Sequence, residues 1–324
     1  MAQRVLVTGM GAEMGTRVTN LLEADERIDE IVGVDIDPPR RRIHRAHFER
    51  IDPRDRRRLV RLVRELEPTA VVHLGVYEPD ARCGPRLAQR LTHEMAIAAV
   101  GAAAESPALE RIVVRSGIEV YGRGRGAAVR PDEAVTPEPT SPFGRSLLDV
   151  EDIARFAGAT AGVPVTLLRC APIVGPHMAS PLGRFLRLPV VPVGLLSDAP
   201  FSVVHQEDAA HAFVRAFECG FDGAVNVVAP GAVTPKQAAR IGRRLPLPVV
   251  GPQWAAAAFA SELLGAPLPG HVRELLVRGR AADGALARSV LGIAPELATP
   301  AVVQDLYEWA TVSYLRPSAE EIAE

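Results

Sequence analysis

The fold of this chain is decided near its start, where residues 5–15 read VLVTGMGAEMG. An apolar run ends at a glycine-rich turn, and the residues after the turn have a helical apolar pattern that includes Val18 and Leu22. A strand, turn and helix of this kind predict a pyrophosphate site, because the helix start offers free N–H groups and the positive end of its dipole. Gly9 would allow the tight turn, and Gly15 would let the helix pack close to the sheet.

A second apolar run, residues 30–34, ends at Asp35, which lies 20 residues after Gly15. An acidic side chain at this distance can accept hydrogen bonds from the adenosine ribose of a dinucleotide. The middle glycine of the fingerprint is replaced by Ala12, so we expect weaker or slightly displaced binding rather than its loss. A turn without any ligand is the alternative interpretation, because glycines mark many turns.

The arginines at 40–42 could receive the 2′-phosphate of NADP, but Asp35 would repel that phosphate. A solvated basic loop is the simpler interpretation of these arginines. The sequence therefore favours NAD over NADP as the cofactor.

Composition limits the classes of function. The chain has 324 residues, of which 48% are hydrophobic, and a formal net charge of -2. These values indicate a globular protein without bulk attraction for nucleic acid or an anionic membrane. Cys83, Cys170 and Cys219 lack metal-ligand spacing and suit a reducing compartment. Since we find neither a signal-peptide pattern nor an unbroken apolar span, we expect a cytoplasmic protein without a metal site.

Apolar strands alternate with helical patterns up to Arg169, which predicts a Rossmann-type α/β fold with a doubly wound parallel sheet. After the first two strands we expect strands at 70–75, 111–117, 165–169, 201–205 and 223–228, and helices at 54–65, 87–104, 143–158 and 207–218. We predict a dinucleotide-binding domain at 1–175, to which 201–228 returns. Residues 176–200 and 229–315 would form a smaller, discontinuous α/β lobe.

In this order and spacing the segments resemble the extended short-chain dehydrogenase/reductase family, also called the NAD-dependent epimerase/dehydratase family. The motifs that carry the resemblance are Asp35, Asp52, Val-Thr-Gly at 7–9, Val-His-Leu-Gly at 72–75, Val-Tyr-Gly at 120–122, Leu-Arg at 168–169, Gly-Pro at 175–176 and the segment 205–208. The resemblance implies NAD along the strand ends and a nucleotide sugar, or a similar hydroxylated ligand, under the smaller lobe. It also implies a homodimer built from the helices around 87–104 and 147–157, to which Leu148, Ala99 and Val100 could contribute.

Carried over by position, the resemblance assigns cofactor contacts to individual residues. Asp35 would hold the adenosine ribose, and Asp52 would contact the adenine. Leu74 and Gly75 would line the diphosphate and the ribose. The pyrophosphate would face Gly9, Gly11, Ala12, Glu13, Met14 and Gly15. From the residues alone, Asp52 could equally cap the helix that follows it.

The catalytic positions of the family differ in this chain. The family uses Tyr-x-x-x-Lys at the start of a helix, with a Ser or Thr at the end of the fourth strand. Phe143 stands at the Tyr position, Leu147 at the Lys position and Gly117 at the Ser/Thr position. Loss of a general base typically reduces the rate by about 10²–10⁴-fold, so the standard mechanism is not expected here.

Three interpretations follow from these differences. In the first, an enzyme uses relocated acid–base groups, for which Tyr121, Glu119 and Ser116 are the foremost candidates; Arg145, Tyr77 and Glu78 are further ones. In the second, the protein binds NAD without turning it over, as a sensor or an assembly partner. In the third, the fold is a scaffold that has lost the cofactor. The structural alternative for Tyr121 is packing under its loop, and for Glu119 pairing with an arginine.

Overall fold

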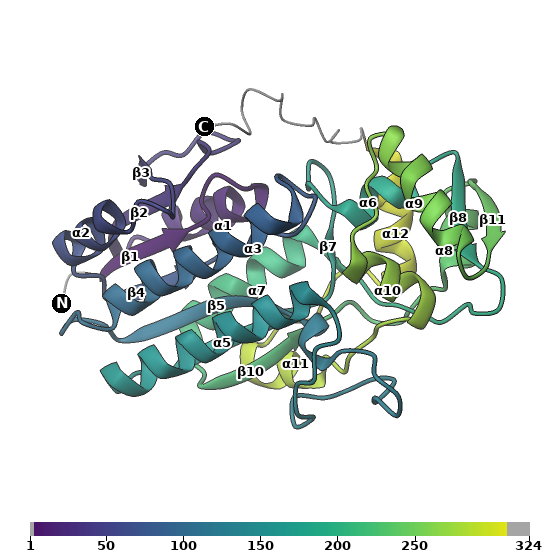
Figure 1. The fold of residues 1–324 in the computed structure, drawn as a ribbon. Helices are drawn as coiled ribbons and strands as arrows, with labels where there is room; N and C mark the ends of the chain where they lie inside the picture. The colour runs from purple at the N-terminus through teal and green to yellow at the C-terminus, as the bar shows by residue number, and fades with distance from the viewer. Residues whose placement is uncertain (1–2, 310–324) are drawn as a thin grey trace.

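The computed structural model describes residues 3–309, and its centre is a parallel sheet of seven strands with helices on both faces (Figure 1). In spatial order the strands are β3 (His47–Arg50), β2 (Ile28–Asp35), β1 (Gln3–Thr8), β4 (Ala70–His73), β5 (Arg111–Gly117), β6 (Val165–Cys170) and β10 (Gly223–Val227). The expected Rossmann-type doubly wound sheet is confirmed. The strand order reverses between β1 and β4, and open sheets of this kind bind ligands beyond the carboxyl ends of the strands at that point.

Alternating strand residues form a separate core on each face of the sheet. Val5 and Val7 of β1 belong to one core, and Leu6 belongs to the other. The first core contains residues of α1 (Glu13–Glu23), α7 (Gln206–Cys219) and α11 (Ala285–Leu291). Helices on the second face are α2 (Arg56–Leu66), α3 (Pro85–Met95), the π-helical turn η1 (Ala96–Val100), α4 (Gly101–Ala103) and α5 (Pro142–Ala161).

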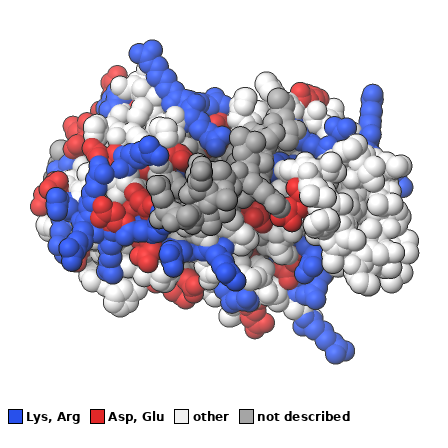
Figure 2. All heavy atoms as spheres, turned by 45° about the horizontal axis from the view of Figure 1, so that its top comes forward, with Lys and Arg blue, Asp and Glu red and all other residues white. Residues whose placement is uncertain are grey.

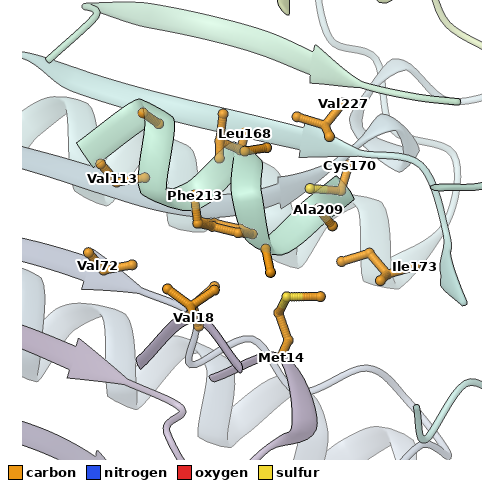
Figure 3. Close-up of a cluster of buried hydrophobic side chains, with 14 of the residues drawn as sticks. Met14, Val18, Val72, Val113, Leu168, Cys170, Ile173, Ala209, Phe213 and Val227 are labelled. Atoms are coloured by element: carbon orange, nitrogen blue, oxygen red, sulfur yellow. The ribbon is translucent and has the colours of Figure 1, made fainter. Parts of the chain in front are cut away.

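The first core joins the beginning of the chain to its middle. Figure 3 shows Met14 and Val18 of α1 pointing toward Phe213 of α7, with Val72 and Leu168 of the sheet on one side. All five side chains are almost completely buried. This packing fixes the start of α1 relative to the strand ends, and therefore fixes the turn between β1 and α1.

The smaller lobe has a core of its own. Phe185, Phe201 and Leu276 are fully or almost fully buried in it. Its elements are β7 (Ile173–Val174), α6 (Pro181–Leu186), β8 (Val190–Gly194), β9 (Val204–His205), α8 (Pro235–Ile241), β11 (Leu245–Val249), α9 (Gln253–Leu263), α10 (Gly270–Arg278) and α12 (Thr299–Glu308). The strand expected at 201–205 is reduced to β9, which pairs with β7 outside the main sheet.

Some segments differ from the expectation. β3 adds a strand to the sheet that the sequence pattern did not predict. The segment from Ala282 to Ile293, which the sequence analysis assigned to the smaller lobe, packs in the first core beside α7 and β10. The predicted end of the lobe at residue 315 lies outside the described residues.

Charge is distributed unevenly over the surface. Figure 2 shows basic side chains gathered at the end of the molecule that carries α2 and β3, and a smaller lobe with few charged side chains on this face. Several large apolar side chains of that lobe are exposed, namely Leu196, Leu245, Phe259, Leu263 and Leu264. Within residues 3–309, no helix has the length and apolar character needed to cross a membrane.

Candidate functional site

Two of the glycines where β1 meets α1, Gly9 and Gly15, leave no room for a side chain. Gly9 has a φ of 73°, and a Cβ atom added there would lie 2.7 Å from the carbonyl oxygen of Leu74. A Cβ atom at Gly15 would lie 2.0 Å from the carbonyl oxygen of Gly9. Gly9 therefore brings the turn into contact with the segment after β4, at the point where the strand order reverses, and Gly15 lets the first turn of α1 pack against the backbone of Gly9.

The N-terminus of α1 fits a phosphate group. Ala12 is the N-cap residue, with extended backbone, and no side chain caps the helix. The first-turn N–H groups are the donors that an anion can use in place of a cap. Glu13 brings a negative charge to this turn, but its carboxylate pairs with Arg17 at 2.7 Å and with Arg41 at 2.8 Å. The N–H groups of this turn therefore remain suited to an anion, because two arginines balance the negative charge of Glu13.

A narrow cleft runs from this turn along the strand ends. Ala12, Glu13 and Met14 of the α1 start line it. The rest of its lining is Arg40, Val76, Tyr77, Glu78, Ala81, Arg82, Arg115 and residues 177–179. These residues come from five separate parts of the chain, which the fold brings together. We call this space the cofactor cleft.

Asp35, at the end of β2, is completely buried and has protein partners. Its carboxylate accepts hydrogen bonds from the Tyr77 hydroxyl at 2.9 Å and from Arg82 Nη1 at 3.0 Å. Arg82 also pairs with Asp37 at 2.6 Å. A ribose hydroxyl that binds Asp35 must therefore share the carboxylate with Tyr77 and displace or join the Arg82 guanidinium.

The other predicted cofactor residues lie around the same strand ends. The backbone N–H of Gly75 donates to Thr8 Oγ1 at 3.1 Å, which holds the segment of Leu74 and Gly75 against β1. A Cβ atom at Gly11 would lie 1.9 Å from the carbonyl oxygen of Asp37, so the turn also packs closely against the chain after β2. These contacts bring the predicted pyrophosphate and ribose residues together.

Asp52 lies beyond β3, in the turn before α2. Its carboxylate pairs with the Arg54 side chain at 2.6 Å, and this pairing lowers the pKa of Asp52. The residue that caps α2 is Asp55, whose side chain accepts from the N–H of Arg58. Asp52 is therefore not the helix cap, and its carboxylate is partly exposed.

Ser116 and Tyr121 belong to a buried polar network. The Ser116 hydroxyl donates to Glu151 at 2.6 Å, and the Tyr121 hydroxyl donates to Asn226 at 2.8 Å. Arg169 links the two halves, because it donates twice to Glu151 and once to the Tyr121 oxygen. Burial raises the pKa of Tyr121 above its usual value, although Arg169 and Asn226 oppose the shift.

This network satisfies the polar atoms of both candidates inside the protein. The Tyr121 oxygen is a donor and an acceptor at the same time, so it can exchange a proton with a ligand only if a partner moves away. Its raised pKa also moves the hydroxyl away from the value that suits proton transfer near neutral pH.

A second, smaller cavity adjoins the cofactor cleft. Phe143 and Leu147 of α5 form part of its wall, together with Gly117 and Cys170 of the strand ends, Glu119 of the 3₁₀ turn η2 (Ile118–Tyr121), Leu182 of α6, and His271 and Leu275 of α10. Glu78 and Arg115 line both the cavity and the cofactor cleft. The two spaces therefore share Glu78 and Arg115 as a common wall, and we call the second one the ligand cavity.

Glu119 is nearly buried in the ligand cavity and pairs with Arg280. The distance from Arg280 Nη1 to Glu119 Oε1 is 3.3 Å, and the same guanidinium pairs with Glu274 at 2.5 Å. A Cβ atom at Gly117 would lie 2.3 Å from Glu119 Oε2, so a larger residue there would displace this carboxylate. The pairing with an arginine is the arrangement that the sequence analysis gave as the structural alternative.

Comparison with known proteins decides the family. The profile of the NAD dependent epimerase/dehydratase family matches residues 5–228. The chain belongs to this family. An uncharacterised protein of Mycobacterium tuberculosis is 31% identical over 312 residues, which is 94% of this chain and 83% of that protein. A UDP-glucose 4-epimerase of Azospirillum brasilense is 28% identical over 185 residues, which is 56% of this chain and 51% of the epimerase.

Solved epimerase structures share the fold. The UDP-glucose 4-epimerase of Thermotoga maritima, determined with UDP-glucose, has a TM-score of 0.73 at 19% identity, over 95% of this chain and 98% of that one. The UDP-glucose 4-epimerase of Thermus thermophilus, determined with NAD, has a TM-score of 0.73 at 20% identity, over 94% of this chain and 98% of the other.

Three residues of this epimerase-family site were missed in the sequence analysis. Arg82 forms an ion pair with Asp35, Arg280 forms an ion pair with Glu119, and His271 lines the ligand cavity. No local pattern marks these residues, because their partners are 47, 161 and 193 positions away in the chain.

Proposed function

We propose that this epimerase-family protein binds NAD in the cofactor cleft and acts on a nucleotide sugar, or a similar hydroxylated ligand, in the ligand cavity. The observation that carries the proposal is the junction of the two spaces at Glu78 and Arg115. When bound, NAD would supply reversible acceptance of a hydride from a carbon that carries a hydroxyl group. The protein would supply the binding, the orientation and the proton transfer.

The residues that would hold the cofactor are those of the turn and the strand ends. The uncapped N-terminus of α1 would bind the pyrophosphate through Ala12, Glu13 and Met14, with Gly9 and Gly15 giving the backbone its close approach. Asp35 would accept from the ribose, and Asp52 would reach the adenine. We propose NAD rather than NADP, because the Asp35 carboxylate repels a 2′-phosphate.

In this proposal the usual catalytic Tyr, Lys and Ser/Thr are replaced by Phe143, Leu147 and Gly117. Support comes from their place, since all three line the ligand cavity. Neither Phe nor Leu can exchange a proton, so the acid–base group must lie elsewhere in the cavity.

A second candidate function is an NAD-binding sensor without turnover. The observation that favours it is the buried network of Ser116 and Tyr121, whose hydroxyls both have protein partners. In that case the redox state of the bound cofactor, rather than a reaction product, would be the output.

We further propose a homodimer, although not through all of the residues named from the sequence. Ala99 and Val100 are completely buried in the second core, against the sheet, and cannot contact a partner. The outer faces of α2, η1, α4 and α5 instead form a groove, in which Val60, Ile97, Ile153 and Phe156 lie among charged residues of α2 and α5. Phe156 is 76% exposed, and an exposed aromatic side chain of this size favours a partner that covers it.

Fluorescence titration with NADH and NADPH tests the cofactor proposal. The wild-type protein is expected to bind NADH more tightly than NADPH. Asp35→Asn should weaken NADH binding about tenfold, the effect of losing one charge-assisted hydrogen bond. Asp37→Asn is the matched control, since Asp37 also pairs with Arg82 but is exposed to solvent. Equal effects of the two substitutions would remove Asp35 from the cofactor site.

A further inference from the structure

His271 is held in a defined orientation inside the ligand cavity. It is the second residue of α10, and its side chain is only 5% exposed. Its Nε2 atom lies 3.1 Å from Glu78 Oε1. The imidazole ring also packs against the Phe143 ring, with 4.7 Å between the ring centroids. A carboxylate and an aromatic ring thus fix the imidazole from two sides.

The pair of His271 and Glu78 lies where the cofactor cleft and the ligand cavity meet. Glu78 lines both spaces, and His271 lines the ligand cavity. Phe143, which touches the imidazole, occupies the position of the family's catalytic Tyr by the sequence resemblance. The imidazole is therefore next to the place from which a proton would otherwise be transferred.

Other polar groups in the cavity are less suited to proton transfer. Ser116 donates to the buried carboxylate of Glu151. Glu119 forms a buried ion pair with Arg280, so its side chain already has a charged protein partner. Among residues 3–309, the hydrogen-bond partner of the His271 ring is Glu78, which contacts Nε2. Nδ1 remains as the ring nitrogen that can exchange a proton with a ligand.

We propose that His271 is the catalytic acid–base residue of this protein and that Glu78 is a positioning residue that orients its ring. The inference rests on the proposed function. Bound NAD would supply the acceptor for the hydride, with its two electrons, from the alcohol carbon of the ligand. The hydroxyl proton of the same alcohol would pass to Nδ1 of His271, which would leave the ligand as a carbonyl compound, and the reverse reaction would return both. A carboxylate that orients an imidazole in this way recurs in unrelated enzymes.

The first test compares His271→Ala and Glu78→Gln with the wild type in a single turnover. Protein and NAD are mixed with UDP-glucose or UDP-glucuronic acid, and NADH formation is followed. We expect a loss of about 10²–10⁴-fold in His271→Ala, partly restored by added imidazole, and a smaller loss in Glu78→Gln. His205→Gln is the matched control, because His205 pairs with Asp305 at 3.4 Å outside the cavity. It should react like the wild type.

The affinity for NADH, measured by titration in every variant, separates the inference from the proposed function. If the wild type does not bind NADH, the proposed function falls and the inference with it. If the wild type binds NADH but neither nucleotide sugar is oxidised, the role of His271 falls while cofactor binding stands. If His271→Ala binds NADH normally and reacts at the wild-type rate, His271 is not the acid–base residue. Loss of NADH binding in His271→Ala, without rescue by imidazole, would instead show a structural role.

A second readout does not depend on turnover. In protein labelled with ¹⁵N-histidine, the His271 ring signals are identified by their loss in His271→Gln. Addition of UDP-glucose to the NADH complex should shift the Nδ1 signal of His271 and leave that of His205 unchanged. An unchanged His271 signal in the presence of bound UDP-glucose would overturn the proposal.

Discussion

Removal of the Glu151 carboxylate is the perturbation whose effect the structure defines best. Glu151 is completely buried on α5, and its partner Arg169 on β6 is 2% exposed. Two hydrogen bonds join them, from Arg169 Nε at 2.9 Å and from Nη2 at 2.8 Å, and Ser116 adds a third at 2.6 Å. Burial opposes the ionisation of Glu151, but the hydrogen bonds and charge of Arg169 outweigh it and lower the pKa of Glu151.

Glu151→Ala would leave the Arg169 guanidinium buried without its counter-charge. Breaking a buried ion pair by removing one partner costs about 3–5 kcal/mol, so we expect this loss in the free energy of unfolding. Arg155→Ala is the matched control. Arg155 donates to the same carboxylate at 2.8 Å, but its side chain is 44% exposed, and exposed pairs contribute only about 0–1 kcal/mol.

Urea unfolding followed by circular dichroism measures both variants against the wild type. The expected result is a large downward shift of the midpoint for Glu151→Ala and a small one for Arg155→Ala. If the two variants differ by less than about 1 kcal/mol, the network does not hold α5 to the sheet. The interpretation of Ser116 and Tyr121 as structural residues would then lose its basis.

Two further predictions concern the cofactor cleft and pH. Arg82→Ala should lower the affinity for NADPH relative to NADH about tenfold, because no guanidinium then offsets the Asp35 charge; parallel titrations measure the ratio, and an unchanged ratio refutes the role. Burial lowers the pKa of His73 to about 4 from an ordinary 6.5. As the pH falls from 6.5 to 5, His73 is protonated in the unfolded chain but stays neutral in the native protein. The free energy of unfolding should therefore fall by about 1–2 kcal/mol. Urea unfolding at both pH values should show a smaller decrease in the free energy of unfolding for His73→Gln than for the wild type. An identical pH dependence in the variant and the wild type would contradict this role of His73.

Much of the main sheet could be predicted from the sequence, because its strands are buried on both faces. Residues 111–117 form one of them, as their apolar run and flanking turns indicate. β3 escaped prediction because its residues are His47, Phe48, Glu49 and Arg50, which have no apolar alternation. β11 escaped because it contains Pro246 and Pro248, which a strand tolerates only where its N–H groups need no partner.

Only the local part of the candidate site could be predicted in the same way. The turn from Gly9 to Gly15 and the acid at Asp35 are separated by one helix, and their spacing is visible in the chain. The pairs of Asp35 with Arg82 and of Glu78 with His271 depend on how loops and the smaller lobe pack. The structural alternatives for Tyr121 and Glu119 were foreseen, but their partners, Asn226 and Arg280, could be identified only in three dimensions.

The central claim is that NAD binds in the cofactor cleft, and its most direct test is a crystal structure of the protein crystallised in the presence of NADH. The account predicts the diphosphate against the N-terminus of α1, the adenosine ribose on the Asp35 carboxylate, and the Arg82 guanidinium moved from its present contact with Asp35. It also predicts the nicotinamide end near Glu78 and Arg115, where the cofactor cleft meets the ligand cavity. A cleft in which no cofactor binds, with Arg82 still paired to Asp35, would contradict the account.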